Sequence, residues 1–124
     1  MEKEILFRIS RPYKIYATKK TPAVQVPSVE GDITILTGRA PTLFLLGNGV
    51  VRLLDRQGKA TESYFVKGGI ADVARDRCAI SSEKVVAAEN IDLEKAVQKR
   101  DSAIHEEDKI FYQMVIDKIK SSAV

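Results

Sequence analysis

Residues 4 to 87 alternate between apolar and polar side chains in short runs that turn residues interrupt at close intervals. Alternation with a period of two is typical of strands that bury one face. The alternating or apolar runs are Ile5–Ile9, Tyr13–Ala17, Val24–Val26, Ile33–Ile35, Thr42–Leu46, Gly49–Leu54, Lys59–Lys67, Ile70–Val73, Cys78–Ser81 and Val85–Ala87. We expect about ten short antiparallel strands that form a two-sheet β-sandwich or a flattened barrel.

Turn residues divide these runs and predict how the chain reverses. Gly47-Asn48 between two apolar runs predicts a tight hairpin, and Asp55–Gly58 predicts a second one. Gly68-Gly69 predicts a bulge or a positive φ where the backbone approaches a neighbour closely. Pro41 and Gly49 are further turn positions that we interpret as structural.

After Ala88 the pattern becomes helical, without Gly or Pro and rich in Lys, Glu and Ala. Asp92 is a suitable N-cap, and Glu94 in the first turn complements the helix dipole. Two helices in a hairpin are expected, with one continuous helix as the alternative. The apolar positions on the two predicted helical faces are Leu93, Ala96, Val97 and Ile104, then Ile110, Phe111, Met114, Val115 and Ile119. We therefore divide the chain into a β-sandwich domain at residues 1–88 and a helical segment at residues 89–124.

Composition narrows the functional classes. The chain has 124 residues and a net charge of +3, and the charges are spread along the sequence, which argues against nucleic-acid binding. The longest apolar runs are too short to span a membrane. The acidic start Met1–Glu4 is unlike a secretory signal, so we expect an unprocessed, non-secreted protein. Cys78, the single cysteine, lies in an apolar run and is expected to be buried.

Catalytic patterns are missing from the sequence. His105 is the single histidine, and one Cys with one His cannot build the usual zinc site. No Gly-rich phosphate loop or nucleophile elbow is present. We therefore predict no catalytic residues, no metal site and no required cofactor.

Five turn sites stand in a recognisable order: Glu30-Gly31-Asp32, Gly38, Ala40-Pro41, Gly49 and Gly68-Gly69-Ile70. In this order and spacing the chain resembles the epsilon subunit of F-type ATP synthases. That family has Gly, Pro, His and Pro at the positions where this chain has Thr34, Thr37, Arg39 and Asn48.

The resemblance implies a non-catalytic rotor subunit between the gamma subunit and the proteolipid ring, at the cytoplasmic face of a bacterial inner membrane or its organellar equivalent. It assigns the ring contact to Glu30, Gly31, Asp32, Gly38 and Arg39. The family's C-terminal helices either fold on the sandwich or extend towards the alpha and beta catalytic subunits and inhibit hydrolysis. The tail here is short for such a reach.

A second fragment, Ile91–Ala96, resembles the Ile-Asp-x-x-Arg-Ala sequence with which some epsilon subunits bind regulatory ATP. It would place nucleotide contacts at Ile91, Asp92 and Lys95, although Lys95 lacks the planar fork of the family's Arg. A capped helix start explains the fragment more simply, and we favour it over a nucleotide site. The alternative functions are a free-standing β-sandwich module that binds a peptide or small ligand, and an RNA-binding sandwich.

Overall fold

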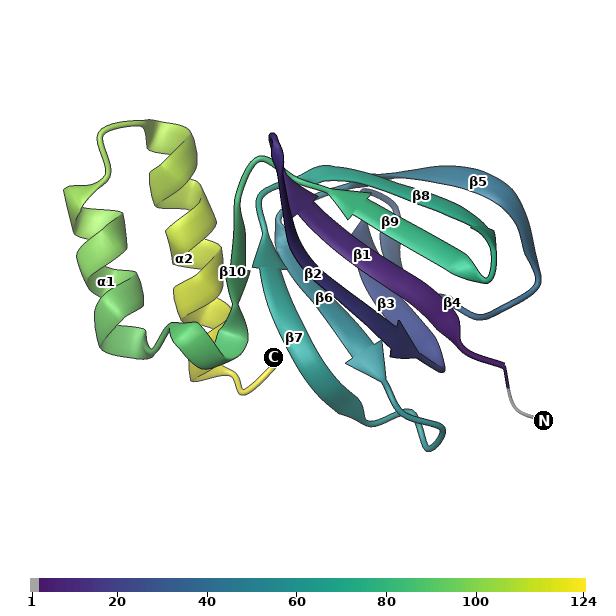
Figure 1. Cartoon of the computed structure of the whole chain (residues 1–124). Coiled ribbons are helices and arrows are strands. Elements are labelled where there is room, and N and C mark those ends of the chain that lie inside the picture. The colour runs from purple at the N-terminus through teal and green to yellow at the C-terminus, as the bar shows by residue number, and fades with distance from the viewer. Residues whose placement is uncertain (1–2) are drawn as a thin grey trace.

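The computed structural model describes residues 3–124, which form ten strands followed by a helical hairpin (Figure 1). The strands are β1 (Ile5–Arg11), β2 (Lys14–Thr21), β3 (Ala23–Ser28), β4 (Gly31–Ile35), β5 (Arg39–Leu46), β6 (Gly49–Leu54), β7 (Ala60–Val66), β8 (Gly69–Arg75), β9 (Arg77–Ser81) and β10 (Val85–Ala87). A 3-10 turn, η1 (Ala88–Asn90), leads to the helices α1 (Leu93–Ser102) and α2 (Glu106–Lys120). The predicted sandwich with a helical appendage is confirmed.

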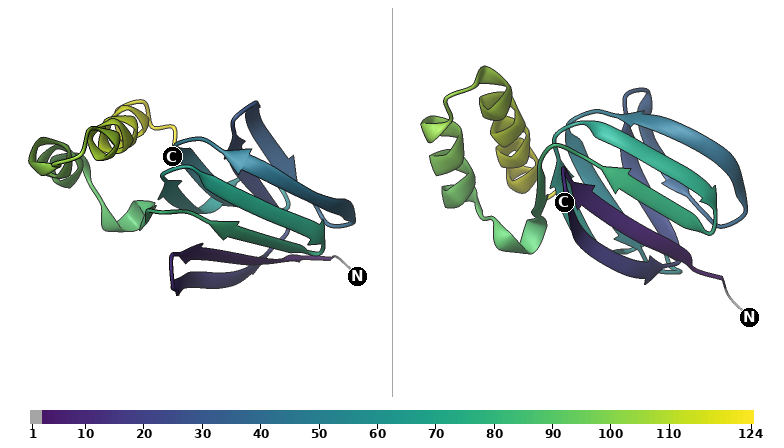
Figure 2. Two further views of the ribbon diagram at one scale, coloured as in Figure 1. Left: turned by 90° about the horizontal axis from the view of Figure 1, so that it is seen from above. Right: turned by 45° about the horizontal axis from the view of Figure 1, so that its top comes forward.

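One continuous hydrogen-bonded ladder runs in the order β10-β7-β6-β3-β5-β8-β9-β1-β2. Strand β4 lies outside this order and pairs with the edge of β3 opposite β6. The ladder folds over on itself, and its two halves form the layers of the sandwich (Figure 2). A single residue pair, Ser28 with Leu46, links β3 to β5 and joins the two halves. All pairs are antiparallel except β1 with β9, which the long chain segment between these strands permits.

The core lies between the layers, and aromatic rings cross it. Phe7 of β1 packs on Tyr64 of β7 with ring centroids 5.9 Å apart, and Tyr16 of β2 meets the same ring edge-on at 6.0 Å. Cys78 is fully buried, as expected from its apolar run. Its burial raises the pKa of the thiol to about 12, so the thiolate needed for reaction does not form at neutral pH.

The predicted hairpin at Gly47-Asn48 is wrong. β5 pairs with β8 and β3, whereas β6 pairs with β3 and β7, so the two strands that flank this dipeptide are not partners. The Gly47 amide instead donates to the Pro27 carbonyl at 2.9 Å, and an added Cβ at Gly49 would lie 2.6 Å from the Pro27 β-carbon. The dipeptide therefore carries the chain from one layer to the other across β3.

The tail forms two helices, so the hairpin interpretation is confirmed and the continuous helix is excluded. The Asp92 carboxylate accepts from the Lys95 amide at 2.8 Å and caps α1, as predicted. The second helix begins after Ala103–His105. Within residues 3–124, neither helix has the length and apolar character needed to cross a bilayer.

Gly68 directly precedes β8 and Gly69 begins it, and both have positive φ, at 58° and 127°. An added Cβ at Gly69 would overlap the Ser81 carbonyl oxygen of β9. The close approach of β8 to β9 therefore depends on the missing side chain.

Replacing Gly69 with Ala should lower the free energy of unfolding by about 1 to 3 kcal/mol, because the new Cβ meets backbone in a left-handed conformation. Urea denaturation followed by circular dichroism measures this loss. Gly47→Ala is the matched control, since open space surrounds that position. An unchanged midpoint for Gly69→Ala would contradict the close approach.

Candidate interaction surfaces

The outer face of β5 exposes contiguous apolar side chains. Leu43 and Leu45 point outward and are 69% and 55% exposed, and Ile70 of β8 lies directly opposite Leu45. Val29 adjoins them because its amide donates to the Leu45 carbonyl at 2.9 Å. We name Val29, Leu43, Leu45 and Ile70 the β5 face. An exposed apolar group of this kind on a sheet marks an interaction surface.

Glu30, Gly31 and Asp32 lie where the chain turns from β3 into β4, beside Val29, and we name these three residues the Glu30 turn. The Ser28 hydroxyl donates to the Gly31 carbonyl at 2.7 Å and accepts from the Glu30 amide at 3.1 Å. Gly31 adopts φ 122°, a conformation that favours glycine. The side chains of Glu30 and Asp32 are exposed. A fixed turn thus presents two carboxylates at the Leu46 end of β5.

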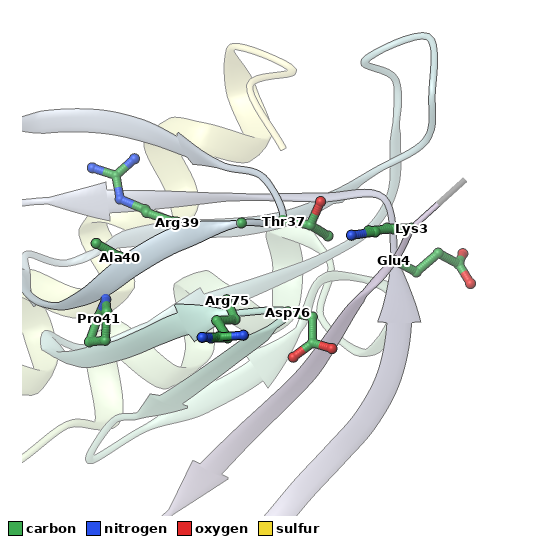
Figure 3. A pocket seen from close by; sticks show the side chains of 9 residues that line it. Lys3, Glu4, Thr37, Arg39, Ala40, Pro41, Arg75 and Asp76 are labelled. Atoms are coloured by element: carbon green, nitrogen blue, oxygen red, sulfur yellow. The ribbon is translucent and has the colours of Figure 1, made fainter. Parts of the chain in front are cut away.

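Gly38 and Arg39 lie at the other end of β5. The Gly38 amide donates to the Arg75 carbonyl at 2.8 Å, and Arg39 pairs with Arg75 in the ladder. The Arg39 guanidinium lies 5.0 Å from the centre of the Phe44 ring. Gly38, Arg39 and Pro41 line one hollow, whose volume is about 740 Å³ (Figure 3). The five residues assigned to the ring contact thus form two groups separated by the length of β5.

The hairpin packs on the sandwich through a second apolar cluster. Phe111 and Val115 of α2 are fully buried and share this cluster with Val50 and Phe65, which face outward from β6 and β7. The remaining buried members are Ile91, Ala96, Tyr112 and Ile116. The predicted faces need correction: Leu93, Ile104 and Ile110 are exposed, and Tyr112 and Ile116 are buried instead. The apolar face of α2 is turned from the predicted one because its partner is the outer surface of β6 and β7.

A buried lysine joins the sandwich to the start of α2. The Lys67 side chain is 8% exposed, and its amine contacts Asp108 at 2.9 Å, Glu107 at 3.3 Å and Glu83 at 3.4 Å. Lys84 adds a contact to Asp108 at 3.6 Å. We name these five residues the Lys67 cluster. It links the β7 end and the β9–β10 loop to the first turn of α2, where acidic residues also complement the helix dipole.

Opposite effects act on the pKa values of this cluster. Burial alone would lower the pKa of Lys67, but hydrogen bonds from its amine to Asp108, Glu107 and Glu83 outweigh burial and raise that pKa above its usual range. The hydrogen bond from Lys67, aided by Lys84, holds the pKa of Asp108 below its usual value. Both groups are therefore charged at neutral pH.

Arg52 makes a further attachment near the end of the chain. Its guanidinium donates to the Gln25 side-chain oxygen at 2.8 Å and to the Ala123 carbonyl. The residues after α2 therefore lie against β6. Sequence patterns missed both Arg52 and Lys67, although a lysine directly after the apolar run Tyr64–Val66 is a signal of a partly buried cation.

The residues of the nucleotide-like fragment lie together at the start of α1. Ile91 is buried in the second apolar cluster, Asp92 is engaged as the N-cap, and Lys95 is exposed. The shallow hollow beside them, about 400 Å³, is also lined by Glu89 and Asn90. Two carboxylates against one amine make this hollow a poor match for a triphosphate, and a capped helix start explains the fragment.

Comparisons with known proteins agree with this architecture. The family model for the ATP synthase, delta/epsilon chain, beta-sandwich domain matches residues 4–88. The ATP synthase epsilon chain of Rhizobium meliloti (strain 1021) is 32% identical over 92 residues, which are 74% of this chain and 68% of that protein.

Two solved structures share the fold. A chain of the Euglena gracilis mitochondrial ATP synthase, from an OSCP/F1/c-ring structure, matches with a TM-score of 0.68 at 21% identity and covers 98% of this chain and 82% of its own. A chain from the central stalk/c-ring structure of the Tetrahymena thermophila enzyme matches with a TM-score of 0.61 at 14% identity, over 100% and 98%.

The Lys67 cluster predicts how attachment of the hairpin depends on pH. Asp108 contributes stability above its unfolded pKa near 3.8, and this contribution is lost as the pH falls through the lower folded value. Lys67 contributes below its unfolded pKa near 10.5, and its contribution is lost as the pH rises through the higher folded value. Attachment should therefore be strongest between about pH 5 and pH 10.

Hydrogen exchange of the α2 amides measures this attachment. Lys67→Met should speed exchange in the first turn of α2 and weaken its acid dependence, because the carboxylates lose their shared cation. Lys19→Met is the control, since it removes an exposed pair with Glu62. Equal exchange in wild type and Lys67→Met across this pH range would show that the apolar cluster alone holds the hairpin.

Proposed function

Because the chain belongs to the family of ATP synthase delta/epsilon chains, we propose that it is a central-stalk epsilon subunit that links gamma to the proteolipid ring of a rotary F-type ATP synthase during proton-driven ATP synthesis. The match over residues 4–88 is the observation that carries this proposal. The subunit would act mechanically, without catalysis, at the membrane periphery. The membrane surface on which it would act is the cytoplasmic face of a bacterial inner membrane or the equivalent organellar side.

The physical requirement for such a linker is a stiff body with separate contact surfaces. A close-packed sandwich provides the stiff body, because its interior deforms little under load. The β5 face and the Glu30 turn provide two separate contact surfaces, because they adjoin each other without overlapping. In this arrangement the apolar β5 face contacts gamma, and the Glu30 turn contacts the polar loops of the ring.

The choice of the Glu30 turn for the ring rests on which turn keeps the family residues. Glu30-Gly31-Asp32 retains the family's acid-Gly-acid sequence, whereas the loop before β5 has Thr37 and Arg39 in place of Pro and His. Since the two turns lie at opposite ends of β5, we assign the ring contact to the Glu30 turn alone and leave Gly38 and Arg39 to a different partner.

Residues 1–88 would form this stiff body, and residues 89–124 would brace or regulate it. The folded hairpin, held by the second apolar cluster and the Lys67 cluster, supports a braced state with weak inhibition. Contact with the alpha and beta subunits requires both attachments to release. A regulatory ATP molecule at Ile91, Asp92 and Lys95 is not needed for this role.

Reversing the charge of the turn tests the ring contact. Glu30→Lys with Asp32→Lys should lower ATP-driven proton pumping several-fold relative to hydrolysis, because the turn would repel or misalign the ring loops. Pumping and hydrolysis are both measured in membranes that carry the whole complex. Glu89→Lys with Glu94→Lys is a control of equal charge change on exposed residues near α1. An unchanged pumping-to-hydrolysis ratio in the turn variant would remove this assignment.

Ending the chain after Asp92 tests the role of the hairpin. Assembly of the complex should persist, whereas the melting temperature of the isolated subunit should fall, since Val50 and Phe65 lose their apolar cover. Differential scanning calorimetry and hydrolysis assays measure the two effects. A several-fold rise in hydrolysis with an unmoved melting temperature would show that the hairpin instead acts on the catalytic subunits.

A further inference from the structure

The start of β1 and the turn between β8 and β9 lie at the end of the sandwich away from the helices (Figure 1). Five cationic side chains that the sequence keeps apart line the hollows there. They are Lys3, Lys20, Arg39, Arg75 and Arg77, which we name the basic end. The ladder explains the convergence: Leu6 pairs with Lys20 on one side and with Arg77 on the other, and Arg39 pairs with Arg75.

These cations are not neutralised within the described part of the chain. Over residues 3–124 none of the five takes part in an ion pair, although Lys19, Lys67, Lys84 and Arg100 do. Glu4 and Asp76 are the acidic residues that line the same hollows. Among the described residues that line these hollows, five cations less two carboxylates leave a positive charge of three.

Two features of the basic end are unfavourable for the isolated fold. Arg39 and Arg75 stand opposite each other across the β5–β8 ladder, where like charges destabilise a sheet. Arg75 also adopts φ 47°, a left-handed conformation that residues with a Cβ seldom adopt. Within residues 3–124, the Arg75 carbonyl accepts from the Gly38 amide and the Arg39 guanidinium lies on the Phe44 ring, but neither contact supplies a negative charge. An anionic partner would offset the repulsion between the two guanidinium groups.

The shape of the basic end indicates the kind of partner. Two adjoining hollows of about 740 and 660 Å³ share Glu4, Pro41, Arg75 and Asp76. Figure 3 shows Arg39 and Arg75 projecting from neighbouring strands, with Lys3 farther along the hollow. The hollows carry no aromatic side chain on which a nucleic-acid base could stack, and they are concave rather than flat like a lipid surface. Side chains of an acidic peptide segment fit such a surface.

We propose that the basic end binds an acidic segment of gamma through carboxylates paired with Arg39, Arg75 and Arg77. The proposal rests on the proposed function and adds the place and chemistry of a second gamma contact. Guanidinium groups suit this role, because they bind carboxylates through two parallel hydrogen bonds. The Phe44 ring beneath Arg39 holds one guanidinium in position before binding. The sandwich then presents opposite charges at the two ends of β5.

The test measures the affinity of the full-length chain for purified gamma of the same complex by calorimetry, between about 50 and 300 mM salt. Arg75→Glu with Arg77→Glu should weaken binding by at least about tenfold and flatten its salt dependence. Lys14→Glu with Lys99→Glu is the control, with the same change in net charge on exposed residues elsewhere, and should bind like wild type. Arg75→Gln with Arg77→Gln should show an intermediate loss, and circular dichroism checks that every variant folds.

The outcomes separate the two proposals. Gamma binding by wild type and by Arg75→Glu with Arg77→Glu at equal affinity would overturn the inference and leave the proposed function standing. No gamma binding by wild type would overturn both. Vesicles with about one third anionic phospholipid are the second probe. Vesicle binding that the same variant loses, with gamma affinity unchanged, would assign the basic end to a membrane surface and overturn the proposal.

Discussion

The pairing of β5 with β8 rather than with β6 is the constraint on which the rest of this structure depends. Because β5 leaves the β3–β6–β7 layer at the single Ser28–Leu46 pair, the ladder folds into two layers instead of continuing as a flat sheet. The same switch turns the apolar side chains Leu43 and Leu45 outward. It also sends the Glu30 turn and the Arg39 loop to opposite ends of one strand. The separation of the proposed contact surfaces therefore follows from strand order.

The junction with the helices combines two interactions of different character. Burial of Phe111 and Val115 on Phe65 supplies a non-directional attraction that scales with apolar area. The Lys67 cluster adds direction, because its amine must meet three carboxylates that come from two different segments. Removing a cation from water is costly, so this cluster specifies where α2 begins more than it stabilises the fold.

Local patterns predicted the elements but not all of their neighbours. The alternating runs gave ten strands, and the Asp92 cap gave the start of α1, because both depend on residues close in sequence. The Gly47-Asn48 turn was assigned the wrong partners, since turn chemistry indicates a reversal without saying which strands then pair. The family resemblance located Glu30 and Arg39, yet only the register showed that they lie far apart. The hairpin contacts depend on Lys67 and Arg52, whose partners are distant in sequence.

The distribution of charge shows most clearly how the fold differs from what local sequence patterns predict. Along the sequence the cations look evenly spread, which argued against nucleic-acid binding. In the fold, the segment before β1, the end of β2, the start of β5 and the turn between β8 and β9 meet at one end, so a small net charge becomes a local excess of cations. Self-repulsion at that end opposes folding, whereas approach of a carboxylate would relieve it. A rotor body with its acidic turn and its basic end at opposite ends of a rigid strand would hold a fixed orientation between two differently charged partners, because exchanging the ends would place like charges together.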